Sequence, residues 1–232
     1  MVTSEENWRI VVVGGHTRSI GKTQLVCDVI AAFPEANWIA GKITQYGHGV
    51  CAQNGHDCDC APDEHVCAIS WEKHADTGTD SARFLAAGAR RSFWLRTKQG
   101  FLAEGMPLLR AALRHEAVSP GGQPANVILE SNTLLQFLKP TLYLMVLHPA
   151  KADFKESAHL QIDRASVFIL REPLQDVATS QGTAAIWKDV PLRLLIAKPQ
   201  FLQREGESLP RGLTEMVRIA LRAQSEDLSI RL

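Results

Sequence analysis

The segment from Gly15 to Gln24 has the residue types and the spacing of a phosphate-binding loop. It follows a short apolar run that is typical of a buried strand, and Gly21, Lys22 and Thr23 lead directly into a helical pattern. In such a loop, backbone N–H groups surround an anion, a lysine reaches the β- and γ-phosphates of a nucleotide, and a hydroxyl holds Mg²⁺. The sequence therefore predicts a nucleotide site in which Lys22 is catalytic and Thr23 is a magnesium ligand.

The loop is a variant of the P-loop pattern G-x-x-x-x-G-K-[ST]. The first glycine of that pattern would fall on His16, and Gly15 stands one position too early. The residues expected to bind the nucleotide are Gly15, His16, Thr17, Arg18, Ser19, Ile20, Gly21, Lys22, Thr23 and Gln24. Arg18 either neutralises phosphate charge, in its own subunit or across a dimer, or faces solvent. His16 either approaches the γ-phosphate or is structural.

Glu130 closes another strand pattern, in which it follows three consecutive apolar residues. Phosphoryl chemistry needs a carboxylate that binds Mg²⁺ directly or through water, and this group commonly lies at the carboxyl end of a strand beside the P-loop. Burial of a carboxylate without a partner is costly, which favours a functional role over a structural one. We therefore expect Glu130 to be catalytic and to bind Mg²⁺.

Asp80 lies at the start of another helical pattern, between Thr79 and Ser81. A Thr or Asp at this place is typical of a helix N-cap, because its side-chain oxygen accepts a backbone N–H bond. The sequence leaves open whether this segment is a cap alone or also contacts the nucleotide or Mg²⁺. Asp80 is the candidate magnesium ligand in the second case.

Four of the five cysteines are clustered with two histidines in one short stretch, at Cys51, His56, Cys58, Cys60, His65 and Cys67. Thiolate and imidazole ligands favour Zn²⁺ or an iron–sulfur cluster over Mg²⁺ or Ca²⁺. The C-x₂-C pairs of zinc ribbons and ferredoxins are absent, so a transferred metal such as nickel, and no metal at all, remain alternatives. We expect Cys51, Cys58, Cys60 and Cys67 to bind zinc or an iron–sulfur cluster, with either histidine able to replace one thiolate.

Short apolar, β-branched runs alternate with helical patterns along the chain, which is typical of βαβ units. The predicted strands are Arg9 to Val13, Trp38 to Thr44, Ser92 to Arg96, Asn126 to Glu130, Leu142 to Leu147, Val167 to Leu170 and Leu192 to Ala197. The predicted helices are Lys22 to Phe33, Asp80 to Ala87, Pro107 to His115 and Leu213 to Ala223. This order predicts an α/β protein with a P-loop NTPase fold, in which a mostly parallel sheet of about seven strands has helices on both faces.

The chain has 232 residues, of which 45% are hydrophobic, and can form a substantial core without disulfides. We expect a single domain over residues 1–232. Residues 46–79 are rich in Gly, Cys, His and Asp, and they are too long for an ordinary connection. We expect them to form a Cys/His-rich, metal-binding insertion within that domain.

The spacing of Gly15, Gly21, Lys22 and Thr23 resembles that of dethiobiotin synthetase and related members of the SIMIBI class of P-loop NTPases. Other motifs resemble molybdopterin-guanine dinucleotide biosynthesis protein B (MobB-like), namely Gly41-Lys42-Ile43-Thr44, Asp76 to Arg83 and Ala86 to Ala89. Together with the P-loop, the resemblance covers the chain from its start as far as about Glu130. The resemblance implies a SIMIBI-type fold, supports Glu130 as a site residue, and implies a homodimer with nucleotide sites near the interface.

Positive and negative side chains balance, with 25 Lys and Arg against 25 Asp and Glu. No global field therefore draws the protein to nucleic acid or to an anionic membrane. The polar N-terminal segment lacks the pattern of a signal peptide, and no apolar run reaches the length that spans a bilayer. We expect a cytoplasmic protein whose partners are nucleotides and other small molecules or proteins.

Base selectivity and the reaction remain open. Neither Leu170-Arg171-Glu172-Pro173 nor Ala197-Lys198-Pro199 matches the N-K-x-D signature of guanine sites, so ATP is favoured slightly over GTP. One interpretation is an NTP hydrolase that acts as an accessory or maturation factor, with a partner protein, for a cofactor or metal centre. The others are an ATP-dependent small-molecule kinase or ligase, and a nucleotide-gated metal carrier with negligible turnover.

Overall fold

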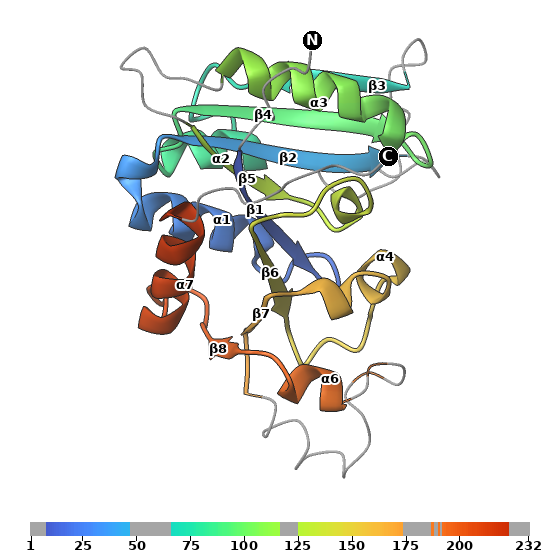
Figure 1. The fold of residues 1–232 in the computed structure, drawn as a ribbon, viewed down its shortest axis with the longest axis vertical. Coiled ribbons are helices and arrows are strands. Elements are labelled where there is room, and N and C mark those ends of the chain that lie inside the picture. The colour runs from blue at the N-terminus through green and yellow to red at the C-terminus, as the bar shows by residue number, and fades with distance from the viewer. Residues whose placement is uncertain are drawn as a thin grey trace.

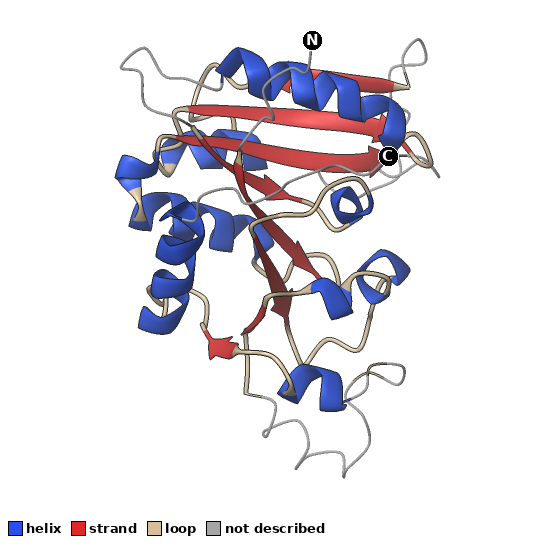
Figure 2. Cartoon of the chain, in the orientation of Figure 1, coloured by secondary structure: helices blue, strands red, loops and turns tan. Residues whose placement is uncertain are grey.

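The computed structural model describes residues 8–46, 66–116, 125–173, 187, 190 and 192–222. These residues form an eight-stranded sheet with helices on both faces (Figures 1 and 2). The strands are β1 (Arg9–Gly15), β2 (Trp38–Tyr46), β3 (Cys67–Trp71), β4 (Arg91–Lys98), β5 (Asn126–Glu130), β6 (Leu142–Leu147), β7 (Val167–Leu170) and β8 (Gln200–Leu202). The α-helices are α1 (Lys22–Ala32), α2 (Asp80–Ala86), α3 (Leu102–Glu116), α4 (Glu156–His159), α6 (Leu192–Ile196) and α7 (Arg211–Arg222). Short 3-10 helices are η1 (Pro34–Ala36), η2 (Thr133–Gln136) and η3 (Ile162–Arg164).

The sheet is parallel except at one edge. Its strand order is β3-β4-β2-β5-β1-β6-β7-β8, and only β3 and β4 pair in antiparallel fashion. Because β1 lies between β5 and β6, the carboxyl ends of these three strands meet at one edge, where open α/β sheets bind ligands. The predicted fold class, a mostly parallel sheet with helices on both faces, is confirmed.

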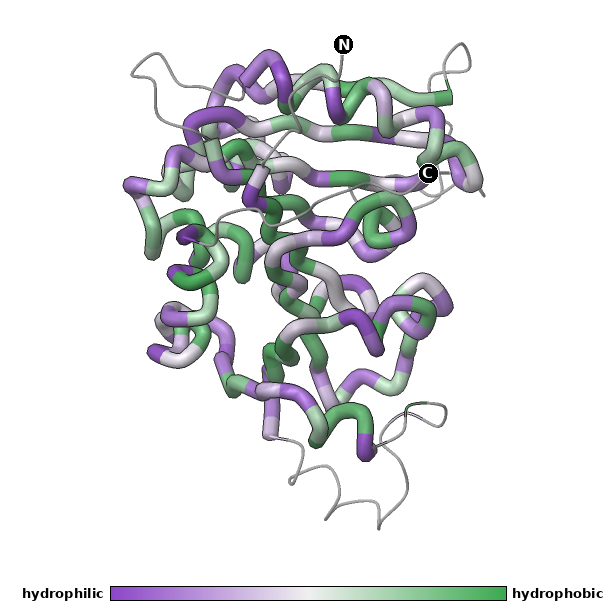
Figure 3. The backbone as a smooth tube through the Cα atoms, in the orientation of Figure 1, coloured by the Kyte–Doolittle hydropathy of each residue, from purple (hydrophilic) through white to green (hydrophobic). Residues whose placement is uncertain are grey.

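Alternate side chains of β1 enter two separate apolar layers. Val11 and Val13 pack into the layer on one face, and Val12 packs into the layer on the other face, all fully buried. A strand exposes successive side chains to opposite faces, so a continuous apolar run is needed when both faces are covered. Hydrophobic residues accordingly run along the central strands (Figure 3).

The helices divide between the two layers. On one face, α1, α2 and α7 contribute Leu25, Phe84 and Leu213 to the core. On the other face, α3 and η2 contribute Leu109 and Leu134. The starts of α1 and α2 lie at the same edge of the sheet as the ends of β2 and β5.

The prediction of a strand at Leu192 to Ala197 is wrong, because Leu192–Ile196 is the helix α6. A short apolar run fits either element by periodicity alone. In the structure Leu195 is buried and Leu194 is partly buried against the core, whereas Arg193 and Ile196 are exposed. Only one side of the run thus faces the core, which a helical turn satisfies.

Two strands were not predicted and one predicted strand is a helix, so the sheet has eight strands where about seven were expected. β8 has only three residues. It follows α6 in the sequence and pairs with β7. β3 lies within the segment expected to be an insertion, and all five of its residues are half-buried at the antiparallel edge. Residues 46–79 are therefore not wholly irregular.

Among the described residues, no helix combines the length and the apolar composition needed to cross a bilayer.

Candidate functional site

The P-loop connects β1 to α1 at the carboxyl edge of the sheet. Ser19 (φ 50°) and Gly21 (φ 82°) have left-handed backbone conformations, and Gly21 is the N-cap of α1. Glycine adopts this conformation without the steric cost that a Cβ imposes. Lys22 is the first residue of α1, and its Nζ donates a 2.6 Å hydrogen bond to the carbonyl of Thr17. The loop therefore folds back over its own lysine.

Asn132, which follows β5, fixes the start of this loop. Its Oδ1 accepts a 2.8 Å hydrogen bond from the N–H of Gly15, and its Nδ2 donates a 2.8 Å bond to the carbonyl of Gly15. A Cβ at Gly14 would lie only 2.4 Å from the Asn132 Oδ1, so this amide needs a glycine there. The segment after β5 therefore shapes the loop.

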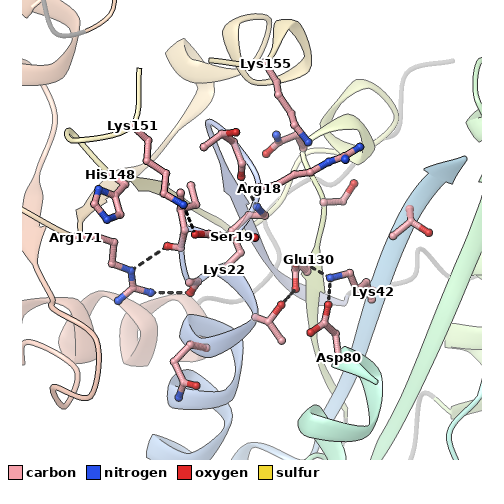
Figure 4. A pocket seen from close by; sticks show the side chains of 18 of the residues that line it. Arg18, Ser19, Lys22, Lys42, Asp80, Glu130, His148, Lys151, Lys155 and Arg171 are labelled. Carbon is pink, nitrogen blue, oxygen red and sulfur yellow. Dashed lines mark hydrogen bonds and ion pairs between the residues drawn. The ribbon is translucent and has the colours of Figure 1, made fainter. Parts of the chain in front are cut away.

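Four polar side chains from different elements converge beside Lys22. The Thr23 hydroxyl donates a 2.7 Å hydrogen bond to Glu130 Oε2, and Lys42 Nζ lies 3.2 Å from Glu130 Oε1. Lys42 also forms an ion pair with Asp80, the first residue of α2 (Figure 4). Glu130 is only 5% exposed, so its carboxylate depends on these partners. The predicted magnesium ligands Thr23, Glu130 and Asp80 thus lie in one cluster around Lys42.

The pKa values of Lys42 and Lys22 are shifted in opposite directions. Burial alone would lower the pKa of Lys42, but the Glu130 and Asp80 carboxylates outweigh it and raise the pKa above its ordinary value. Burial lowers the pKa of Lys22, and Glu130 opposes that shift. Lys42 therefore stays charged and balances the two carboxylates, whereas at Lys22 the effect of burial exceeds that of Glu130.

The cluster forms one wall of a cleft of about 1210 Å³. The P-loop from Thr17 to Gln24 forms its floor. The opposite wall comes from segments that follow β6, β7 and β8, and the basic side chains on it are His148, Lys151, Lys155, Arg171 and Arg204. The cleft therefore has the cluster around Glu130 on one side of the phosphate loop, and on the other side a wall that carries these basic groups together with Glu172 and Glu205.

Arg171, directly after β7, holds the P-loop from the basic side. The guanidinium is buried, and it donates to the carbonyls of Ile20 (3.2 Å) and Gly21 (2.7 Å), as Figure 4 shows. It also donates to the backbone and side-chain oxygens of Gln203 at 3.0 and 3.1 Å. Arg171 therefore links the loop to the end of β8.

Replacement of Arg171 by methionine is expected to lower the free energy of unfolding by about 2–4 kcal/mol, because the buried carbonyls of Ile20 and Gly21 lose their donor. Chemical denaturation of the wild-type and variant proteins measures this loss. Arg211→Met is the matched control, since Arg211 is exposed at the start of α7, and it should change the stability by less than about 0.5 kcal/mol. Equal stability of Arg171→Met and wild type would contradict the role of Arg171.

The segment after β6 is fastened to the P-loop through His16 and Thr17. The His16 Nδ1 lies 2.8 Å from the Asp153 carbonyl, and its Nε2 accepts a 3.1 Å bond from the His148 N–H. The Thr17 hydroxyl donates to the Asp153 carboxylate, and the Lys155 N–H donates to the His16 carbonyl at 2.9 Å. These bonds hold the segment as a wall over the loop.

His16 is fully buried, and its ring packs against Phe154 and Trp187. Since Nε2 accepts a bond, the ring is neutral with its proton on Nδ1. Burial is the main cause that lowers the pKa of His16 from 6.5 to about 4, and the hydrogen bond to Asp153 opposes the shift. Of the two alternatives for His16, the structure favours the structural one, because both ring nitrogens are bonded within the protein.

The acid sensitivity of folding tests this account of His16. The unfolded chain binds a proton at this residue below pH 6.5 and the folded chain only below about pH 4. Stability from His16, about 3 kcal/mol, is therefore present above pH 6.5 and lost as the pH falls to 4. Denaturation curves between these pH values should show a shallower loss of stability for His16→Asn than for wild type. Parallel curves would contradict the shift.

The predicted nucleotide residues fall into two groups. Thr17, Arg18, Ser19, Ile20, Gly21, Lys22, Thr23 and Gln24 line the cleft. Gly15 and His16 lie beneath it, where they bind Asn132 and the segment after β6. For Asp80, the N-cap role belongs to its neighbour Thr79, whose hydroxyl accepts the 3.1 Å bond from Ala82 N–H. Asp80 is therefore free to face Lys42.

The predicted cysteine ligands are only partly within the described residues. Cys67 begins β3 as a half-buried free thiol, and its Sγ lies 3.7 Å from the Glu104 carbonyl. Cys51, Cys58 and Cys60 lie outside the described residues. Within the parts of the chain that the structure describes, no three His, Cys, Asp or Glu side chains gather as a metal site. The cysteine metal site remains a prediction.

Sequence reasoning missed Lys42, Lys151 and Lys155 as site residues and did not assign Arg171 to the phosphate loop. Lys42 was visible as a charged residue within a buried strand pattern, which needs an anionic partner. Arg171 gave a similar signal at the end of β7. Lys151 and Lys155 follow β6 in a segment without a motif, so only the fold brings them to the cleft.

No protein-family model matches this sequence, and no curated protein is significantly similar to it. HypB from Helicobacter pylori in complex with nickel is similar in structure, with a TM-score of 0.43 and 11% identity over 94% of this chain and 85% of that chain. The "apo" form of LpxK from Aquifex aeolicus in complex with ATP has a TM-score of 0.43 and 13% identity. That match covers 84% of this chain and 53% of LpxK, so this chain spans about half the length of LpxK. Both similarities are distant.

Proposed function

We propose that this chain is a Mg²⁺-dependent P-loop NTPase that binds ATP or GTP in the cleft. The observation that carries the proposal is the convergence of Lys22, Thr23, Glu130 and Asp80 from α1, β5 and α2 at the carboxyl edge of the sheet. A lysine and a hydroxyl at the start of the P-loop helix, with a carboxylate at the end of the neighbouring strand, are the groups that Mg²⁺ and a triphosphate require.

Each side chain has a defined task in this proposal. Lys22, whose Nζ is bonded to the Thr17 carbonyl, would bind the β- and γ-phosphates in place of that carbonyl. Thr23, Glu130 and Asp80 are the residues that would hold Mg²⁺, and the ion neutralises charge on the phosphate oxygens when bound. Lys42 forms ion pairs with Glu130 and Asp80 and so balances the charge of the two carboxylates.

We favour an accessory or maturation role for a cofactor or metal centre, because it accounts for both the P-loop and the cysteine-rich stretch. A small-molecule kinase or ligase is the second candidate. Its support is the size of the cleft, since about 1210 Å³ exceeds the volume of most single-ligand pockets. Polar residues beyond Lys42, such as Thr44 and Gln45, line the space next to the carboxylates. An acceptor molecule has room there.

Turnover assays separate these candidates. Slow hydrolysis of nucleotide without any added acceptor is expected for the accessory factor, and turnover that appears only with a small acid or alcohol is expected for the kinase or ligase. Metal release without turnover would favour the nucleotide-gated carrier instead. Failure of the wild-type protein to bind either nucleotide would contradict all three forms of the proposal.

We also propose that Cys51, Cys58, Cys60 and Cys67 bind zinc or an iron–sulfur cluster. Metal analysis and the absorbance spectrum of anaerobically purified protein should show one or the other. The double variant Cys58→Ser, Cys60→Ser should lose the metal. Cys27→Ala is the matched control and should keep it, because Cys27 is buried on α1 and burial raises the pKa of its thiol to about 11. Unchanged metal content in the double variant would contradict the site.

A homodimer, with the nucleotide sites near its interface, and a MobB-like relationship belong to the same proposal. Their support is the motif resemblance alone. Light scattering with and without Mg²⁺ and nucleotide is the measurement for the oligomeric state, and a monomer under all conditions would contradict the dimer.

A further inference from the structure

Two basic side chains in the cleft differ from the others in how they are bonded within the described residues. Lys22, Lys151 and Arg171 donate to loop carbonyls, and Lys42 is paired with two carboxylates. Among the described residues, Arg18 and Lys155 have no such hydrogen-bond or ion-pair partner. They are exposed and half-buried, respectively, and both line the cleft.

The two side chains lie close enough to repel one another. In Figure 4, Lys155 and Arg18 point toward each other above the P-loop, on the side that faces Glu130 and Lys42. The pKa of Lys155 is lowered from 10.5 to about 8, mainly by burial and also by the charges of Arg18 and Lys22. Asp153 opposes this shift but does not cancel it. Three cations therefore face one region of the cleft, and Asp153 offsets only part of their repulsion at Lys155.

The backbone keeps Lys155 in this place. Its N–H donates to the His16 carbonyl at the start of the loop, and the preceding residues are held through Asp153 by His16 and Thr17. These bonds fix the backbone of Lys155, so on binding a ligand only its side chain would have to be ordered. The arrangement is costly without a ligand, because like charges at short range destabilise the folded protein.

The magnesium cluster shows which part of a nucleotide reaches this region. Mg²⁺ bridges the β- and γ-phosphates, so Thr23 and Glu130 mark the terminal end of the triphosphate. Lys22, which also reaches these phosphates, is one of the charges that Lys155 senses. A terminal phosphate bound by Lys22 would therefore lie near the charges of Arg18 and Lys155.

We propose that Lys155, together with Arg18, binds the terminal phosphate of a nucleoside triphosphate and makes the site favour the triphosphate over the diphosphate. The assignment rests on the proposed function, since it requires a nucleotide in the cleft. It adds a phosphate ligand from the segment after β6, outside the P-loop and the magnesium cluster.

Calorimetric titration with Mg-ATP and with Mg-ADP tests the assignment. Lys155→Met should weaken ATP binding by about 10-fold, since it removes one charged hydrogen bond to phosphate, and should leave ADP binding within about twofold. Lys151→Met is the matched control from the same segment, because its Nζ is already bonded to the Ser19 carbonyl. That variant should change the two affinities by the same factor.

Proton uptake gives a second readout that needs no variant. Near pH 8 about half of the Lys155 side chains in the free protein are neutral, and a bound terminal phosphate would recharge them. ATP binding should take up roughly half a proton more than ADP binding, measured in buffers of different ionisation enthalpy. The charged groups that face Lys155 are Arg18, Lys22 and Asp153, and the difference between ATP and ADP isolates the effect of the terminal phosphate.

An unchanged ratio of ATP to ADP affinity in Lys155→Met, or equal proton uptake for the two nucleotides, would overturn the assignment while the proposed function stands. If the wild-type protein bound neither ATP nor ADP, both the assignment and the proposed function would be overturned. A weaker affinity for ATP and ADP by the same factor would also overturn it, because Lys155 would then act on the loop and not on the terminal phosphate.

Discussion

The Lys22→Ala variant is expected to bind Mg-ATP and Mg-GTP at least about 100-fold more weakly than wild type, because two charged contacts to phosphate are worth about 3 kcal/mol. The Lys22 side chain is placed for this role at the first turn of α1. In the protein its Nζ is held by the Thr17 carbonyl, and burial lowers its pKa. A phosphate therefore gains a preorganised cation, which alanine cannot replace.

A matched control is Lys139→Ala, which removes an exposed lysine outside the cleft. Its nucleotide affinity should equal that of wild type. Circular dichroism shows whether Lys22→Ala remains folded, and this is expected because Lys22 makes a single hydrogen bond within the loop. Retained nucleotide affinity in a folded Lys22→Ala protein would contradict the phosphate site.

Glu130→Gln is expected to reduce nucleotide turnover by at least about 100-fold, which corresponds to about 2.7 kcal/mol in the barrier. The glutamine keeps the shape of the side chain but removes the charge that accepts from Thr23 and balances Lys42. Nucleotide affinity in the absence of Mg²⁺ should change little, because Lys22 and the loop are intact. The enhancement of affinity by Mg²⁺ should be largely lost.

Glu116→Gln is the matched control for this substitution. Glu116 is also a buried carboxylate, 7% exposed, and it is paired with Arg90 and Arg91 at the end of α3, away from the cleft. It should lose stability without any change in Mg²⁺ dependence. If both variants showed the same Mg²⁺ dependence as wild type, Glu130 would not be a magnesium ligand.

The sequence predicted well where strong local patterns agree with the fold. Strands β5, β6 and β7 have the predicted bounds, because each contains a short apolar run and all of its residues are buried. The cluster of Thr23, Asp80 and Glu130 follows from the same logic, since strand ends and helix starts meet at the carboxyl edge of a parallel sheet.

The rest depended on tertiary contacts that no local pattern carries. The run at Leu192 to Ile196 fits a strand or a helix, and packing of Leu195 on the core decides for the helix. The role of Lys155 depends on hydrogen bonds between the segment after β6 and residues near His16, more than a hundred positions away. His16 itself stands at a motif position, but its buried ring takes part in the scaffold.

All of the proposed roles require that the cleft binds a magnesium–nucleotide complex. Calorimetric titration of the wild-type chain with ATP and GTP, in excess Mg²⁺ and again in EDTA, measures this binding directly. Saturable binding of one nucleotide per chain is expected, with an affinity that falls when Mg²⁺ is removed. Absence of saturable binding of either nucleotide in the presence of Mg²⁺ would contradict it.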